Sequence, residues 1–138
     1  MSTVENNETI EYPPFLDNTD FYLPIVEKIL NVSRNDFSIK SFKVNAGSSK
    51  GDNYLSSIYR VSVEVLNLKI NQEINVISII IKVKSSPYMS NEEVDKFNAF
   101  PKENEMYLKL IPEFERLLHN KGIETVFGPK SEYLNVIN

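Results

Sequence analysis

Hydrophobic and polar residues alternate along three stretches in the first two thirds of the chain, and this alternation predicts β-strands. The middle stretch is the most regular, since every second residue from 59 to 65 is apolar. One side of that strand would carry Tyr59, Val61, Val63 and Val65, and the other side Arg60, Ser62 and Glu64. A half-buried strand has this period of two, because successive side chains point to opposite faces of the sheet.

The flanking stretches complete a small sheet. Residues 36–47 predict a first strand, whose alternation slips near Ser41 and indicates a β-bulge. Residues 76–84 predict a third strand. One of its faces would carry Ile77, Ile79, Ile81 and Val83, and the other Val76, Ser78, Ile80, Lys82 and Lys84. Three consecutive strands with short connections favour an antiparallel meander.

Apolar residues at three- and four-residue steps predict helices before and after this sheet. The first helix would be capped by Thr19 or Asp20, and a later one begins at Ser90, which forms a capping box with Glu93. Pro101 either interrupts that helix or begins another at its first turn. The apolar face of the first helix would be Phe21, Ile25, Val26, Ile29 and Leu30, and that of the last one Phe100, Tyr107, Leu110, Phe114 and Leu117.

The end of the last helix and the residues after it can also be predicted. Pro112 should kink this helix, and residues 120–122 should end it, because Gly122 readily adopts the left-handed conformation of a helix C-terminus. Residues 126–138 then predict the start of a fourth strand. The fold class is therefore α+β, an antiparallel β-meander with a packed amphipathic helix.

Length and composition indicate one globular domain. The chain has 138 residues, 41% of them hydrophobic and 25% charged. Residues 1–13 are polar and acidic and predict a disordered tail, which leaves residues 14–138 for the folded domain.

Charge and residue usage exclude several function classes. A formal net charge of −4 argues against nucleic-acid binding, which needs a basic face. The sequence has no cysteine and a single histidine, His119, so disulfides, cysteine-based zinc sites and a histidine-rich metal site are excluded. The N-terminus does not resemble a signal peptide, and the longest apolar run is far too short to span a membrane. We therefore expect a cytoplasmic protein that binds neither nucleic acid nor membrane.

Two charged residues lie where apolar residues are expected. Glu103 falls on the apolar face of the last helix, and Lys82 lies within a β-branched run. Each has an ordinary explanation, because an acid is favoured in the first turn of a helix and a lysine can extend its ammonium to solvent. Lys84, on the same face as Lys82, is a competing candidate.

The order of these features along the chain is that of a protein-kinase N-terminal lobe. In that lobe a glycine-containing hairpin loop covers the nucleotide phosphates, and a lysine on the third strand contacts them. A glutamate on the following helix holds the lysine in place by its opposite charge. Lys82 and Glu103 follow the glycine loop in this order and at a suitable spacing.

The chain resembles the ecdysteroid-kinase-like, or CHK kinase-like, family, which is related to choline and aminoglycoside kinases. The segments that carry the resemblance are "PPFLD", "GDNYLSSIYRVSVEV", "IIIKVKSSP", "FPKENEMYLKLIPEFERL" and "GPKSEY", in the order of the family. The resemblance implies a loop over the ATP phosphates, formed by Gly51, Asp52, Asn53, Tyr54 and Ser56. It also implies that Lys82 contacts the phosphates, that Glu103 is its partner, and that the phosphate acceptor is a small-molecule alcohol such as an ecdysteroid or a xenobiotic.

The same resemblance implies that the C-terminal lobe is absent from these 138 residues. The ligands of the Mg²⁺ that accompanies ATP would lie in that lobe, so we expect no metal ligand here and no catalysis by this chain alone. An unpaired strand edge should then favour self-association. Two alternatives stay open: a non-catalytic interaction or regulatory module derived from a kinase N-lobe, and a generic α+β binding domain in which Lys82 and Glu103 are incidental.

Overall fold

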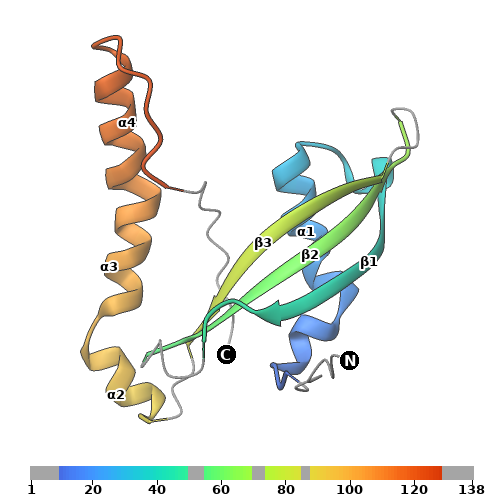
Figure 1. Cartoon of the computed structure of the whole chain (residues 1–138), viewed down its shortest axis with the longest axis horizontal. Helices are drawn as coiled ribbons and strands as arrows, with labels where there is room; N and C mark the ends of the chain where they lie inside the picture. The colour runs from blue at the N-terminus through green and yellow to red at the C-terminus, as the bar shows by residue number, and fades with distance from the viewer. Residues whose placement is uncertain (1–9, 50–54, 70–73, 85–87, 129–138) are drawn as a thin grey trace, which may run out of the picture. The chain divides into compact units, whose positions relative to one another are not determined.

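The computed structural model describes residues 10–49, 55–69, 74–84 and 88–128. These residues divide into two compact units. The first contains the N-terminal helix and the sheet as far as Lys82, and the second contains the later helices and the chain from Val83 onward. Both are drawn in Figure 1. No helix among the described residues is long and apolar enough to cross a membrane.

The sheet is the three-stranded antiparallel meander that the alternation predicts. Its strands are β1 (Phe37–Ala46), β2 (Ser57–Asn67) and β3 (Ile74–Val83), in the order β1-β2-β3. On β2 the alternate residues Tyr59, Val61, Val63 and Val65 are all buried, as predicted. The bulge is also confirmed, because Ile39 pairs with Val65 and Ser41 with Glu64, so that Lys40 is the extra residue.

Helix α1 (Thr19–Leu30) packs on one face of this sheet. The Tyr22 ring lies 4.8 Å from the Phe42 ring, and Phe42 pairs with Val63 across the strands, so α1 covers the face that carries the buried valines. A short 3-10 helix, η1 (Pro14–Asp17), precedes α1 and places Leu16 in the same core. A second one, η2 (Arg34–Asp36), leads into β1.

Two details of the first helix differ from the prediction. Its cap is Asn18, whose side chain accepts a hydrogen bond from the backbone N–H of Asp20 at 3.0 Å, and not Thr19 or Asp20. Tyr22 is fully buried whereas Ile29 is exposed, because Phe42 of β1 provides a contact for Tyr22 that helical spacing cannot predict.

The second unit consists of helices. Helix α2 (Asn91–Lys96) begins with the predicted capping box, in which Ser90 and Glu93 bond to each other's backbone N–H. Asn98 adopts a left-handed conformation with φ 50°, and α3 (Ala99–Glu105) starts there with Pro101 in its first turn. Of the two alternatives for Pro101, the structure has the second one.

Helix α3 continues through η3 (Met106–Leu110), a π-helical segment, into α4 (Ile111–His119), and Figure 1 shows the three as one rod. The sequence predicts a kink at Pro112, and the structure has instead a π-helical segment just before it. Proline has no N–H to donate and its ring crowds the carbonyl four residues earlier, so the backbone widens ahead of it.

The π-helical segment changes which face of the helix is covered. Beyond it Ile111, Glu115 and Leu118 are half-buried, each one residue later than the predicted Leu110, Phe114 and Leu117. Those three predicted core residues are 41%, 49% and 47% exposed. The prediction was wrong here, because the wider turn contains one more residue than a 3.6-residue period allows.

The helix ends where the sequence predicts. Gly122 adopts φ 76°, its N–H donates to His119 O, and the N–H of Ile123 donates to Leu118 O, both at normal distances. The chain then runs back along α4, where the Phe127 N–H donates to Glu115 Oε1 at 2.8 Å. Residues 126–128 are not a strand, and the rest of the predicted fourth strand lies outside the described residues, as do residues 1–9 of the predicted tail.

Candidate functional site

The predicted phosphate loop is described only at its end. Gly51, Asp52, Asn53 and Tyr54 lie outside the described residues. Ser56 directly precedes β2 and is buried, with 4% of its surface exposed. The role of these five residues at the phosphates stays a prediction.

Lys82 lies near the end of β3 in the first unit. Its neighbours Ile81 and Val83 are buried, and since side chains alternate along a strand, Lys82 points to the opposite face. That face also carries Val76 and Ile80, which are 65% and 59% exposed. The sheet therefore has one face covered by α1 and another face, the lysine face, which carries Lys82 and exposed apolar groups.

The competing candidate, Lys84, has a different role. Its Nζ lies 2.6 Å from the Asp95 carboxylate of α2, and the lysine side chain is only 26% exposed. This ion pair ties the end of β3 to α2 within the second unit. Lys84 is thus engaged in a structural contact. Asp95 was not among the predicted site residues, because a pair between a strand and a following helix has no fixed spacing in the sequence.

Glu103 lies in the middle of α3 and is half-buried. Because α3 begins at Ala99 and not at Pro101, Glu103 is outside the first turn, which contains no acid. The helix dipole therefore does not explain this carboxylate, since its effect falls off within the first turn. Lys82 belongs to the first unit and Glu103 to the second, and their pairing stays a prediction.

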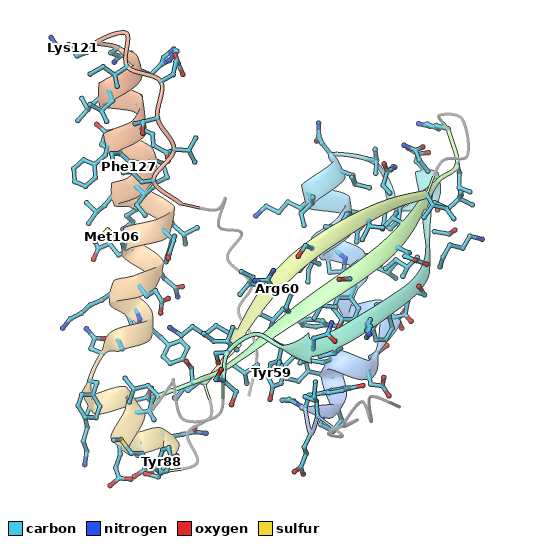
Figure 2. All side chains as sticks on the ribbon, viewed as in Figure 1. Tyr59, Arg60, Tyr88, Met106, Lys121 and Phe127 are labelled. Atoms are coloured by element: carbon cyan, nitrogen blue, oxygen red, sulfur yellow. The ribbon has the colours of Figure 1, made fainter. Side chains whose placement is uncertain are left out.

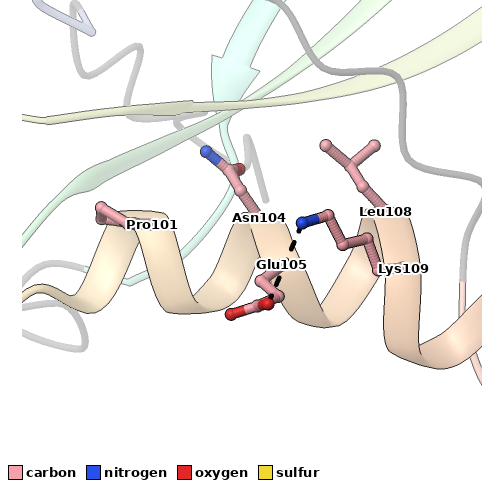
Figure 3. Close-up of a pocket in the computed structure, with 5 residues that line it drawn as sticks. All are labelled: Pro101, Asn104, Glu105, Leu108 and Lys109. Atoms are coloured by element: carbon pink, nitrogen blue, oxygen red, sulfur yellow. Dashed lines mark ion pairs between the residues drawn. The ribbon is translucent and has the colours of Figure 1, made fainter.

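The pocket in Figure 3 does not coincide with these residues. It is lined by Pro101, Asn104, Glu105, Leu108 and Lys109, which all lie on one helical face. Glu105 and Lys109 form an ion pair there, with 4.0 Å between Oε1 and Nζ. A depression formed by one helix has no opposing wall, so it does not enclose a ligand as binding sites do.

A metal site is also not formed within the described part of the chain. No three histidine, aspartate or glutamate side chains there come close enough together to hold a metal ion. The position of the Mg²⁺ ligands outside these residues stays a prediction.

Comparison with known families decides how these positions are understood. The model of the ecdysteroid kinase-like family matches residues 50–136, more than half of the chain. The chain belongs to the ecdysteroid kinase-like family. The match begins at the glycine loop and contains Lys82 and Glu103, so every predicted site residue of this ecdysteroid kinase-like chain lies inside it. No curated protein and no solved structure matches the chain.

Proposed function

We propose that this chain is the ATP-binding N-terminal lobe of a cytoplasmic small-molecule kinase. The observation that carries the proposal is the family match, which spans the loop, the strand lysine and the helix glutamate in one segment. Lys82 binds the nucleotide phosphates, Glu103 orients its ammonium, and the loop from Gly51 to Ser56 covers the phosphates. ATP supplies the phosphoryl group, which goes to the hydroxyl of a small alcohol such as an ecdysteroid or a xenobiotic.

The lysine face of the sheet supports this assignment. A nucleotide needs an apolar surface for its base and a fixed cation for its phosphates. Ile80 and Val76 provide exposed apolar surface on the same face as Lys82, whereas the opposite face is closed by α1. A ligand that approaches this unit therefore finds both kinds of group on one side of the sheet.

Thermal unfolding with MgATP tests the proposal. We expect ATP to stabilise the wild-type chain by about 1 kcal/mol once its concentration is several-fold above the dissociation constant. Lys82→Ala should remove this stabilisation, whereas Lys43→Ala, on exposed β1 surface, should keep it. No stabilisation of the wild type at millimolar ATP would refute an ATP site in this chain.

A double-mutant cycle tests the pairing of the lysine and the glutamate. The effects of Lys82→Ala and Glu103→Ala on ATP affinity should be strongly non-additive, because either change alone disables the same interaction. Additive effects would instead support a generic α+β domain in which the two residues are incidental.

A second function is favoured by one observation in the second unit. Leu110, Phe114 and Leu117 form an exposed apolar stripe on the helix that runs from α3 to α4. Such a surface is typical of protein contacts and would suit a non-catalytic interaction or regulatory module. Sedimentation at several concentrations tests self-association, and a concentration-independent monomer would count against a self-pairing module.

A further inference from the structure

The lysine face of the sheet carries more than one cation. Lys43 on β1 pairs with Ser62 of β2, and Arg60 on β2 pairs with Asn45 of β1, so all four residues lie on the face opposite to the buried valines. Figure 2 shows Tyr59 and Arg60, consecutive on β2, projecting to opposite sides of the sheet. A chain with a net charge of −4 thus gathers Lys43, Arg60 and Lys82 on one face of one sheet.

Arg60 and Lys82 lie close together on this face. The hairpin joins Asn67 to Ile74, so the start of β2 lies beside the end of β3. Directly paired residues point to the same face of a sheet. The buried residues are odd-numbered on both β2 and β3, so Arg60 must pair with an even-numbered residue of β3. Since the start of β2 lies beside the end of β3, this residue is either Ile80 or Lys82. In both registers Lys82 is the direct or the diagonal neighbour of Arg60, within reach of two long side chains.

The Arg60 residue is exposed, and its side chain forms no hydrogen bond or ion pair among the described residues. The acid on the same face of β2, Glu64, lies four positions further along and accepts a hydrogen bond from Ser41 at 2.7 Å. An anion bound between two cations on neighbouring strands pairs with both of them. The position of Arg60 beside Lys82 is therefore suited to an anionic ligand with more than one charged group.

We infer that Arg60 is a second phosphate-binding cation, which contacts the β- or γ-phosphate of a nucleotide held by Lys82. A guanidinium presents paired donors that match two phosphate oxygens, whereas an ammonium acts as a point charge. The two side chains together select nucleoside di- and triphosphates over monophosphates. This inference rests on the proposed function and adds a residue to that site.

Calorimetric titration of the full chain with ATP, ADP, AMP and adenosine tests the inference. We expect Arg60→Gln to weaken ATP and ADP binding about tenfold, the loss expected for a charge-assisted hydrogen bond. Adenosine affinity should not change, because it has no phosphate. Arg60→Lys keeps the charge but loses the paired geometry, so it should recover only part of the affinity.

Lys43→Gln is the matched control, since it removes the same charge from the same face but two strands away from Lys82. At physiological salt it should change ATP affinity less than about twofold, because charges separated by more than a Debye length are screened. An equal loss in Arg60→Gln and Lys43→Gln would show a general field effect and overturn the contact. An ATP affinity unchanged in Arg60→Gln would overturn it too and leave the proposed function standing, whereas a wild type that binds no nucleotide would refute both.

Discussion

Tyr22 offers the sharpest test of how the first unit is held together. Its side chain is fully buried between α1 and the sheet, and its hydroxyl donates a hydrogen bond to the Leu16 carbonyl at 2.6 Å. Tyr22→Phe keeps the ring that packs on Phe42 but leaves the Leu16 carbonyl without this donor. Loss of one partner of a buried hydrogen bond costs about 1–2 kcal/mol of unfolding free energy.

The ionisation of the same hydroxyl adds a second, independent measurement. Burial raises the pKa of Tyr22 from about 10 to about 12, with smaller contributions from the charges of Tyr12 and Asp17. The unfolded chain therefore ionises first, and this residue's contribution to stability, complete below pH 10, is lost as the pH rises from about 10 to about 12. At pH 11, one unit above the unfolded pKa, the wild type should have lost about 1.4 kcal/mol of unfolding free energy relative to Tyr22→Phe, compared with pH 8, since each unit corresponds to that amount.

Urea unfolding followed by far-UV circular dichroism measures both effects. Tyr12→Phe is the control, because the Tyr12 hydroxyl bonds to Asp17 at 3.4 Å in an exposed position. It should change the free energy of unfolding by less than about 0.5 kcal/mol. The packing described here would be refuted if the two variants were equally stable at pH 8, or if the difference between wild type and Tyr22→Phe did not shrink at pH 11.

Two further predictions concern the connections of the sheet. A Cβ at Gly47 would lie 2.6 Å from Ile58 Cγ2, so Gly47→Ala should lower the free energy of unfolding in urea by about 1–3 kcal/mol. Gly128→Ala is the control and should lower it little, because its Cβ would meet Tyr107 at an ordinary 3.5 Å. Equal effects of the two variants would contradict the close contact at Gly47. Lys84→Ala and Asp95→Ala should show a coupling of about 0.3–1 kcal/mol in a double-mutant cycle, because their ion pair is partly exposed; strictly additive effects would mean that it does not stabilise the chain.

Local patterns were enough to predict most of the elements. The alternation of β2, the bulge near Ser41, the capping box at Ser90 and the helix end at Gly122 all depend on residues only a few positions apart. Their conformations follow from backbone sterics and from hydrogen bonds between near neighbours. The family was named from five short sequence segments in order along the chain, and the later comparison confirmed it.

The candidate site was only partly predictable for the same reason. Lys82 and Glu103 could be named from their unexpected polarity, whereas the ion pair that engages Lys84 depends on where α2 packs after the end of β3. The neighbourhood of Arg60 and Lys82 likewise depends on strand pairing, which joins residues more than twenty positions apart.

By itself the sequence determined the order of the three strands of the meander, the capping box of α2, the end of α4, and the family. Only the tertiary structure decided which side chains are covered. On α1 Tyr22 is buried and Ile29 is not, and beyond the π-helical segment Ile111, Glu115 and Leu118 are half-buried in place of the predicted stripe. Burial is a property of contacts between distant segments, and a single wider turn before Pro112 is sufficient to rotate a helix face.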